Sequence, residues 1–424
     1  MSMAISLSLL IFLALGIPVA VSIILASFFG IQLFSNLPVL LIAQQMIVGL
    51  DSFPLLAIPF FILAGNLMSA GGISRRLVDL AKSMVGGFQG GLAMSCVVTC
   101  MMFAAVSGSS IATTFAIGSI LIPAMVRHGY PAPLAASIQA SSSELGVLIP
   151  PSIPLILFGV STQTSIGQLF IGGIGPGLLI AVALLVFLYF FCKIKGYGLD
   201  DNKESLKINT AARNAWVALL MPLLVVGGIY GGVFTPTEAA AVAVVFALVV
   251  GFVVYRELTV DKLWRVLQDS VLSTAAVMLI IAAASLFSFL LSLSGAPVLL
   301  AEWVTETLSS VYMFLMVINI ALLILGMFIE TSSAILVLAP ILTPIAIHYG
   351  IDPVHFGLIM VTNLALGMCT PPLGVNLFAA CSVAKISIVE LLPWLMQFIL
   401  VIGVCLVAIT YFPWITLFLR DLLY

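Results

Sequence analysis

The chain contains few charged residues, and this shortage excludes most soluble folds. Asp, Glu, Lys and Arg together make up 7% of its 424 residues, whereas soluble domains contain about 25%. Hydrophobic residues make up 63% of the chain. The net charge of −2 and the scattering of the basic residues also argue against nucleic acid as a partner. We therefore expect an integral membrane protein surrounded by lipid.

The sequence also lacks the residues that pumps and most enzymes need. It has no glycine-rich phosphate loop with a lysine, and no soluble stretch long enough for a nucleotide-binding domain. Its histidines and cysteines show no metal-ligand spacing, and Asp51, Asp269 and Asp352 lie at the ends of apolar segments. We therefore predict that the chain is not an enzyme. Any transport must be driven by an ion gradient or by a partner.

Nine apolar stretches are predicted to cross a membrane, which takes about 20 residues each. Two of them, about 133–160 and 354–384, contain a Pro-Pro pair. The first stretch lacks the basic start and cleavage site of a signal peptide, so we interpret it as a retained span. The seven stretches without a Pro-Pro pair lie at about 3–30, 53–70, 169–192, 214–230, 236–255, 270–293 and 394–419.

The second half of the chain repeats features of the first half 221 residues later. Proline removes a backbone donor and clashes with the preceding turn, so each Pro-Pro pair breaks a helix and frees carbonyl groups. At membrane depth such groups are tolerated only where protein or a lined cavity satisfies them. Paired broken helices are typical of a transport site. The recurring pairs are Leu145-Gly146 with Leu366-Gly367, Pro150-Pro151 with Pro371-Pro372, Pro123 with Pro344, and Gly129 with Gly350.

Two further apolar segments, about 92–126 and 312–347, are interrupted near the middle by polar residues. The interruptions are Ser107–Ser110 and Glu330–Ser333. Each arm is only about 15 residues long, which is marginal for a span. We therefore predict that both segments are re-entrant hairpins.

Basic residues mark the cytoplasmic side of short loops. The first hairpin is flanked by Arg75, Arg76, Lys82 and Arg127, whereas the second is flanked by Glu302, Glu306, His348 and Asp352. The two hairpins are therefore expected to enter from opposite faces, which predicts inverted repeats. The loops expected on the cytoplasmic side carry Lys193, Lys195, Lys203, Lys207 and Arg213, then Arg256, Lys262 and Arg265, and finally Lys385.

These observations predict an all-α polytopic membrane protein with inverted repeats, two re-entrant hairpins and two broken helices. The first repeat is expected at 1–195 and the second at 231–424. Residues 196–230 are expected to form a cytoplasmic linker and a connecting span that restores the inverted orientation.

Each hairpin tip and its matching break can form one cation site. Sodium needs several oxygens without full negative charges, and hydroxyls from a tip with carbonyls from an unwound helix supply them. Close helix packing through Ser and Gly is the alternative explanation for one such cluster, but the repetition favours two ion sites. The first site is predicted from Ser107, Gly146, Ile149 and Pro151, and the second from Gly326, Thr331, Ser332, Gly367, Thr370 and Pro372.

Helices that begin after the tips point their positive ends toward the centre, a favourable position for a carboxylate. The candidate substrate contacts are Ser109, Ser110, Ser152, Glu330, Ser333 and Asn376. Acidic residues within spans indicate function by default. Glu330 lies at the second tip and Glu144 just before the first break, whereas Glu238 is better explained as a helix N-terminal carboxylate.

Four stretches together resemble the large membrane subunit of tripartite ATP-independent periplasmic (TRAP) transporters, in the ion transporter superfamily. They are AVSGSS at 105–110, LGVLIPPS at 145–152, GIYGGVFTPTEA at 228–239 and GMCTPPLG at 367–374. The similarity covers essentially the whole chain. In combination these motifs are specific, although the serine-rich tip alone is not.

The resemblance implies a sodium-coupled importer that works by an elevator motion. Scaffold helices are then expected at 1–70 and 236–293, and the mobile transport domain at about 90–192 and 312–419. The resemblance also implies two partners, a small membrane subunit and a periplasmic substrate-binding protein. Because this chain begins at once with the large-subunit pattern, we expect the small subunit to be a separate polypeptide.

The expected location is the bacterial inner membrane, with the N-terminus in the cytoplasm and the C-terminus in the periplasm. The expected cargo is a small organic acid, such as sialic acid or a C4-dicarboxylate. Proton coupling through Glu330 or Glu144 stays open as an alternative to sodium. A channel or passive scaffold subunit is the second alternative, against which stands the absence of a repeated filter motif or a charged ring.

Overall fold

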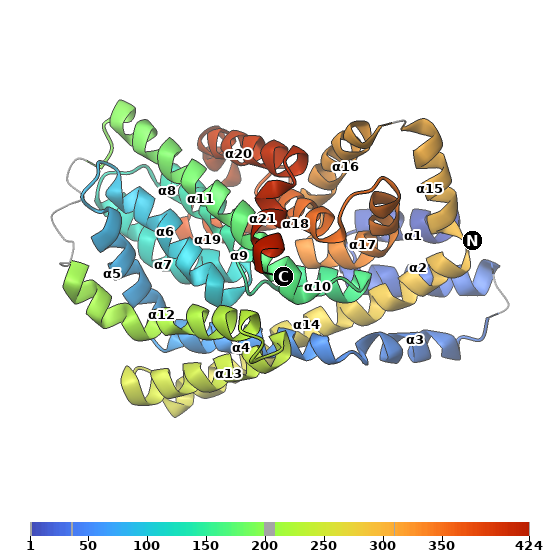
Figure 1. Ribbon diagram of the computed structural model, residues 1–424, viewed down its shortest axis with the longest axis horizontal. Coiled ribbons are helices and arrows are strands. Elements are labelled where there is room, and N and C mark those ends of the chain that lie inside the picture. The colour runs from blue at the N-terminus through green and yellow to red at the C-terminus, as the bar shows by residue number, and fades with distance from the viewer. Residues whose placement is uncertain (1, 35–36, 199–207, 309, 424) are drawn as a thin grey trace.

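A chain segment that crosses lipid without closing into a barrel must be helical, because lipid offers no hydrogen-bond partners for backbone N–H and C=O groups. The computed structural model describes residues 2–34, 37–198, 208–308 and 310–423, and these residues contain helices and no strands (Figure 1). Lys203 and Lys207 of the expected cytoplasmic loop lie outside the described residues.

The N-terminal segment forms a pair of helices. Residues 3–30 were expected to form one crossing, and this expectation is wrong: α1 (Ser2–Ala14) and α2 (Val19–Phe34) are separate and pack against each other. Gly16 adopts a positive φ of 76° and Pro18 follows it, so the chain turns there. Next along the chain are α3 (Leu40–Leu50), a 3₁₀ turn (Phe53–Leu56), α4 (Ala57–Ala70) and α5 (Ile73–Val85).

A layer of long helices runs along the lower side of the view in Figure 1. In this layer α13 packs against α4, α14 against α3 and α4, and α12 against α5. α12 begins at Ile208 and ends at Tyr230, within the range 196–230 expected to hold a linker and a connecting span. The bounds are α12 (Ile208–Tyr230), α13 (Pro236–Val249) with a π-helical turn (Val250–Val254), α14 (Val260–Leu293) and α15 (Ala296–Thr307).

The start of α13 confirms the prediction for Glu238. Its carboxylate accepts hydrogen bonds from the N–H of Thr235 at 2.8 Å and from the Thr235 hydroxyl at 2.9 Å, and the Thr235 hydroxyl in turn accepts from the N–H of Glu238. This reciprocal arrangement is a capping box. Glu238 therefore stabilises a helix end.

The remaining helices form an inner body in two sets. The first set is α6 (Gly91–Ser107), α7 (Ser110–Arg127), α8 (Ala132–Ser143), α9 (Leu145–Leu148), α10 (Ile153–Thr162) and α11 (Ile166–Lys195). The second set is α16 (Val311–Gly326), α17 (Thr331–His348), α18 (Pro353–Met368), α19 (Val375–Ala384), α20 (Ile388–Tyr411) and α21 (Trp414–Leu423). The crossing expected at 394–419 is thus divided at Pro413, between α20 and α21.

Helices interrupted by Pro-Pro pairs were predicted at two places, and both interruptions are present. The first lies between α9 and α10 and contains the cis peptide Pro150–Pro151; the second lies between α18 and α19 and contains the cis peptide Pro371–Pro372. The helix after each interruption packs against the opposite set: α10 contacts α17, and α19 contacts α7. The two sets are therefore interlocked at the breaks.

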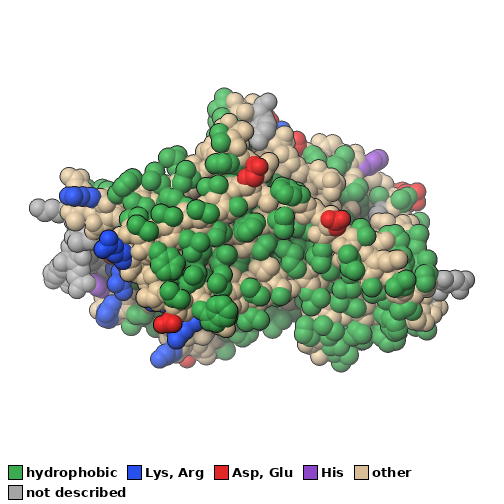
Figure 2. All heavy atoms as spheres, turned by 90° about the horizontal axis from the view of Figure 1, so that it is seen from below, with side chains coloured by type: hydrophobic (Ala, Val, Ile, Leu, Met, Phe, Trp, Pro, Cys, Tyr) green, Lys and Arg blue, Asp and Glu red, His purple; other side chains and the backbone are tan. Residues whose placement is uncertain are grey.

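Nine helices among the described residues are long and apolar enough to cross a membrane. Seven overlap the crossings expected from the sequence. The other two, Ser110–Arg127 and Thr331–His348, are the second arms of the segments expected to be hairpins. Figure 2 shows hydrophobic side chains over most of the visible face, with Lys and Arg gathered at the end where Figure 1 places α5.

Candidate functional site

The tip between α6 and α7 lies directly on the first break. The N–H of Ile153 donates to the carbonyl of Gly108 at 3.2 Å. Gly108 has a φ of 62°, and a Cβ added there would lie 2.8 Å from the carbonyl oxygen of Pro151. Gly146 is equally close to the tip, since a Cβ on it would lie 2.9 Å from the carbonyl oxygen of Ser109. Glycine thus permits the backbone contact between tip and break.

Hydroxyl groups gather at this first contact. Ser107 Oγ and Thr113 Oγ1 share a hydrogen bond of 3.0 Å, and Thr113 Oγ1 donates to the carbonyl of Ser109 at 2.7 Å. Ser109 caps α7 by accepting from the N–H of Ala112 at 3.4 Å. Thr113 was not among the predicted residues. Its position four residues after Ser109, one helical turn, is the signal that could have found it.

The tip between α16 and α17 contacts the second break in the same way. The N–H of Gly374 donates to the carbonyl of Met327 at 3.1 Å. A Cβ on Gly367 would lie 2.5 Å from the Cα of Gly326, so the two backbones touch. Thr331 Oγ1 donates to Met368 Sδ at 3.0 Å, which ties the second tip to the end of α18.

Glu330 caps α17 with its carboxylate. It accepts hydrogen bonds from the N–H groups of Ser332 at 2.9 Å and Ser333 at 3.2 Å, and from the Ser332 hydroxyl at 2.8 Å. A negative charge at the start of a helix is favourable. The carboxylate is therefore held in a fixed position at the second tip.

A cavity of about 780 Å³ reaches both tips. This volume is suitable for a small organic ligand. From the predicted ion sites, Ser107 and Ser332 line the cavity, and from the predicted substrate contacts, Ser109, Ser110 and Glu330 do so. Ser110 Oγ is buried and has no hydrogen-bond partner among the described residues, so it can accept or donate a bond to a ligand.

Three predicted substrate contacts do not line this cavity. Ser152 is buried behind the tip, caps α10 and donates to the carbonyl of Val147 at 2.5 Å. Ser333 lines a separate apolar cavity of about 220 Å³ beside α1 and α2. Asn376 is buried where the two sets of helices interlock.

Asn376 belongs to a polar cluster that joins the two halves. Its Nδ2 lies 2.7 Å from both Ser143 Oγ and Glu144 Oε1, and its Oδ1 lies 2.6 Å from Thr114 Oγ1. Cys369 Sγ donates to the same Glu144 oxygen at 3.0 Å. The other carboxylate oxygen of Glu144 is buried without a partner in the described chain. Glu144 therefore connects the helix before the first break to both sides of the second.

The remaining predicted ion-site residues differ in exposure. Gly146 and Pro151 are buried and Ile149 is half-buried, with its side chain against Gly177 of α11. Gly326, Gly367 and Thr370 are buried, and Thr370 Oγ1 donates to the carbonyl of Leu366 at 2.7 Å. Pro372 is exposed.

Oxygen atoms dominate both contacts between tip and break. The described residues contain no group of three or more His, Cys, Asp or Glu that could hold a metal ion. Hydroxyls and carbonyls suit a hard monovalent cation and do not suit a transition metal.

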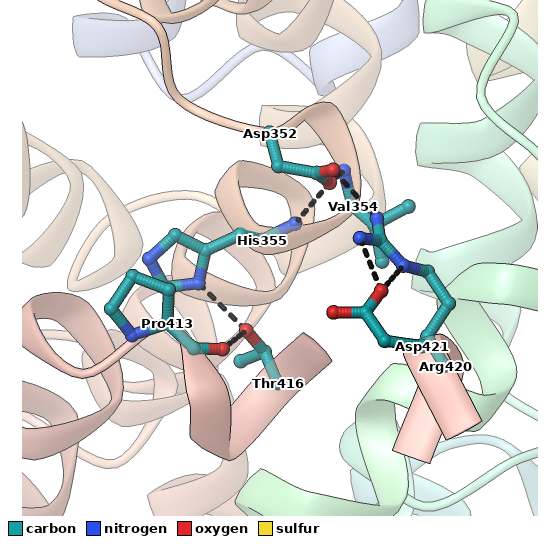
Figure 3. Close-up of polar contacts among 7 residues, drawn as sticks. All are labelled: Asp352, Val354, His355, Pro413, Thr416, Arg420 and Asp421. Atoms are coloured by element: carbon teal, nitrogen blue, oxygen red, sulfur yellow. Dashed lines mark hydrogen bonds and ion pairs between the residues drawn. The ribbon is translucent and has the colours of Figure 1, made fainter. Parts of the chain in front are cut away.

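The second broken helix is anchored to the C-terminal helix (Figure 3). Asp352 caps α18 by accepting from the N–H groups of Val354 at 2.8 Å and His355 at 3.3 Å, and it pairs with Arg420 of α21 at 2.6 Å. His355 is buried and its Nδ1 lies 2.8 Å from Thr416 Oγ1. Burial alone raises the pKa of Asp352, but the bonds from Arg420 and the two N–H groups, with the Arg420 charge, outweigh it and lower the pKa below its ordinary value.

Known proteins resemble this chain over nearly its whole length. The isethionate TRAP transporter permease protein DctMQ of Oleidesulfovibrio alaskensis is 43% identical over 96% of this chain, which spans 64% of that relative's length. The C4-dicarboxylate TRAP transporter large permease protein DctM of Pseudomonas aeruginosa is 45% identical, with 92% of each chain covered. The sialic acid TRAP transporter large permease protein SiaM of Vibrio cholerae is 37% identical, over 96% of this chain and 95% of that one.

The fold also matches a solved structure. The YdaH transporter of Alcanivorax borkumensis, described as having an unusual topology, superposes with a TM-score of 0.67 over 90% of each chain. Its sequence identity is 16%, so this likeness concerns the fold alone. The family model of the tripartite ATP-independent periplasmic transporter, DctM component, matches residues 6–415. The chain therefore belongs to the DctM family of TRAP transporter large permeases.

Proposed function

We propose that this chain is the permease that carries a small organic acid across the bacterial inner membrane, coupled to sodium. The observation that supports this most directly is the shared cavity: both hairpin tips, each bonded to its own helix break, reach one space of about 780 Å³. A substrate in that space would contact both candidate cation sites at once. Such contact is what coupling of substrate to ions requires.

In this proposal, two sodium ions bind where the tips meet the breaks. Ser107 with the backbone of Gly146, Ile149 and Pro151 forms the first site. The second site is formed by Gly326, Thr331, Ser332, Gly367, Thr370 and Pro372. Ser109, Ser110 and Glu330 face the substrate, while Ser152, Ser333 and Asn376 support the surrounding helices.

The movement would be of the elevator type, between inverted repeats at 1–195 and 231–424 joined by 196–230. The mobile part is proposed at about 90–192 and 312–419, and the scaffold at 1–70 and 236–293. The interlocked packing of α10 on α17 and α19 on α7 supports movement of the inner helices as one body. The N-terminus would lie in the cytoplasm and the C-terminus in the periplasm.

The proposed partners are a small membrane subunit and a periplasmic binding protein that delivers the acid. The relatives named above carry isethionate, C4-dicarboxylates or sialic acid according to their names, at 43%, 45% and 37% identity. All three cargoes are anionic. We therefore propose an oxyanion as the feature common to the substrates that this chain can take.

Uptake into proteoliposomes tests the proposal. The chain is reconstituted with its small subunit and binding protein, and uptake of labelled succinate, isethionate and N-acetylneuraminate is measured under an inward sodium gradient. Potassium in place of sodium is the control. Equal uptake in both would contradict sodium coupling. Ser107→Ala and Thr331→Ala should each raise the sodium concentration needed for half-maximal uptake.

Proton coupling is the second candidate, and the buried Glu144 favours it. Its carboxylate has one oxygen without a partner in the described chain and forms no ion pair there. An inward pH gradient without sodium should then drive uptake, and Glu144→Gln should abolish that uptake. A channel would differ from both, because it would conduct without a binding protein.

A further inference from the structure

The cavity extends from the two tips to the beginning of α5. Gly72, Ser74 and Arg75 line this outer end, together with Asn66 and Ser69 of α4. α5 is 13 residues long, and its N-cap is Gly72, which has no side chain to cap the helix. The first N–H groups of a helix lack partners and carry partial positive charge. This end of the cavity is therefore favourable for an anion.

Ser74 provides a second, independent observation. Its side chain lies in the first turn of α5, and the residue is only 4% exposed. Its Oγ has no hydrogen-bond partner among the described residues although it is buried at the cavity wall. A buried hydroxyl without a partner is costly, so a ligand that bonds to it would relieve that cost.

The charges around this end favour an anion as that ligand. Arg76 is occupied: it pairs with Glu257 at 2.7 Å, donates to the carbonyl of Gly72 at 2.8 Å and lies 3.7 Å from the ring centre of Tyr255. Glu257 also lines the cavity beside Gly72, and its ion pair with Arg76 offsets its negative charge. Arg75 lines the cavity, is exposed and forms no ion pair with a described residue; Asp79, one turn further along α5, attracts its charge from a distance.

We propose that Arg75, Ser74 and the N-terminus of α5 form an oxyanion subsite at the mouth of the cavity. This subsite would bind the carboxylate or sulfonate of the transported acid between the tips and the aqueous side. The inference rests on the proposed function. The inner end of the cavity carries the negative carboxylate of Glu330. The positive charge of the subsite lies at the outer end, and this arrangement would help an anion leave the cavity.

The positive potential can be measured without a substrate. All six native cysteines are buried, so Ser69→Cys provides a single accessible thiol at the cavity wall. Ser69 is close to the subsite, because its carbonyl accepts from the N–H of Gly72 at 3.4 Å. The rate of modification by an anionic methanethiosulfonate is compared with the rate for a cationic one in the purified full chain. Arg75→Gln is then added, and Lys82→Gln on the same helix is the matched control, because Lys82 does not line the cavity.

Loss of the Arg75 charge should lower the anion-to-cation rate ratio about tenfold, since one charge about 6 Å away in water changes the energies of the two reagents by about 0.7 kcal/mol in opposite directions. The Lys82→Gln ratio should stay near that of Ser69→Cys alone. An unchanged ratio in Arg75→Gln would overturn the proposal.

A ligand bound at the subsite should protect the Ser69→Cys thiol from the anionic methanethiosulfonate. Comparing ligands in this assay identifies the source of the oxyanion. Succinate, isethionate and N-acetylneuraminate are tested in lipid-free detergent, with dimethyl succinate as the uncharged control and phosphatidylglycerol as a lipid phosphate. Protection by at least one acid that Arg75→Gln weakens about tenfold or more would support a substrate subsite. Protection by phosphatidylglycerol alone, or by no acid, would overturn it, as would protection unaffected by Arg75→Gln. Sodium-driven uptake by the Ser69→Cys chain is measured separately, so a failed subsite is distinguishable from a failed transport function.

Discussion

The two contacts between tip and break share a backbone arrangement and differ in side-chain chemistry. In each, an N–H from the chain after the Pro-Pro pair donates to a carbonyl of the tip, at 3.2 Å in the first and 3.1 Å in the second. The first break is enclosed, with Pro151 and Ser152 buried, and the helix after its tip is capped by the hydroxyl of Ser109. The second exposes Pro372 and Leu373, and its helix is capped by the carboxylate of Glu330.

This difference separates what the repeat determines from what single residues determine. Glycine and proline recur 221 residues apart and produce the same backbone contact twice. The cap residues do not recur: of the two described tip caps, Ser109 is uncharged and Glu330 is a carboxylate. The second candidate cation site should therefore bind its cation more strongly and respond more to solvent than the first.

The largest expected effect comes from the glycine pair at the second contact. In Gly367→Ala the new Cβ would lie 2.5 Å from Gly326 Cα, and backbone cannot move aside easily. In Gly146→Ala the Cβ would meet Ser109 O and Thr113 Oγ1 at 2.9 Å; the threonine can rotate, and the remaining overlap with the Ser109 backbone is smaller than the overlap at Gly367. We expect Gly367→Ala to cost about 3 kcal/mol of stability and Gly146→Ala about 1 kcal/mol. Thermal unfolding in detergent measures both.

Gly227→Ala is the matched control for these variants. Gly227 lies within α12 and has nothing within 4 Å of an added Cβ, so alanine should be neutral or stabilising there. A cost for Gly367→Ala no larger than that for Gly146→Ala would contradict the tighter backbone contact at the second site.

The carboxylate cap at the second tip gives an intermediate effect. Glu330→Ala removes three hydrogen bonds at the start of α17 and should destabilise the protein by about 1–2 kcal/mol. Ser109→Ala removes one bond of 3.4 Å and should cost about 0.5 kcal/mol. Because Glu330 also contributes charge, Glu330→Gln should raise the sodium concentration for half-maximal thermal stabilisation about tenfold.

Ser109→Ala should leave that sodium concentration nearly unchanged, which makes it the control for the charge. If Glu330→Gln responds to sodium as the unaltered protein does, the two contacts do not differ through the charge of Glu330.

The backbone conformation of the site can be predicted from the sequence better than the hydrogen-bond partners of its side chains. The Pro-Pro breaks and the tips at Ser107 and Glu330 follow from local rules, because proline and serine act on the backbone within a few residues. Asn376 was predicted to contact substrate, yet it bonds to Thr114, Ser143 and Glu144. These partners come from helices far apart in the chain, and no local pattern specifies that α19 packs on α7 and α8.

The prediction for the N-terminal region was wrong for a different reason. Residues 3–30 are continuously apolar, and hydrophobicity alone cannot distinguish one crossing from two packed helices. Gly16 and Pro18 were the available signal, and the positive φ of Gly16 is what redirects the chain. In both the first and the last apolar stretch a proline lies between the two helices, Pro18 in the first and Pro413 in the last.

The smallest expected effect concerns the helices that precede the breaks. In the second half α18 is capped by Asp352, which Arg420 also holds, whereas in the first half the N-cap of α8 is Pro131 and provides no side-chain bond. Since the folded-state pKa of Asp352 is lowered, its stabilisation is complete above the unfolded pKa of about 3.9 and is lost as the pH falls through the lower folded value. Both side chains are partly exposed, so solvent screening limits this contribution to about 1 kcal/mol.

Asp352→Asn should therefore lower the free energy of unfolding by about 1 kcal/mol at neutral pH. The difference from the unaltered protein should shrink as the pH falls from the unfolded pKa of about 3.9 through the lower folded pKa, because the Asp352 carboxylate is progressively protonated. Unfolding curves at pH 7 and pH 3 measure it, with Asp421→Asn as the control, since Asp421 contacts Arg420 but caps no helix. If the stability difference between Asp352→Asn and the unaltered protein stays constant between the two pH values, Asp352 acts through its shape and not through its charge. The two halves would then not differ in the electrostatic stabilisation of their broken helices.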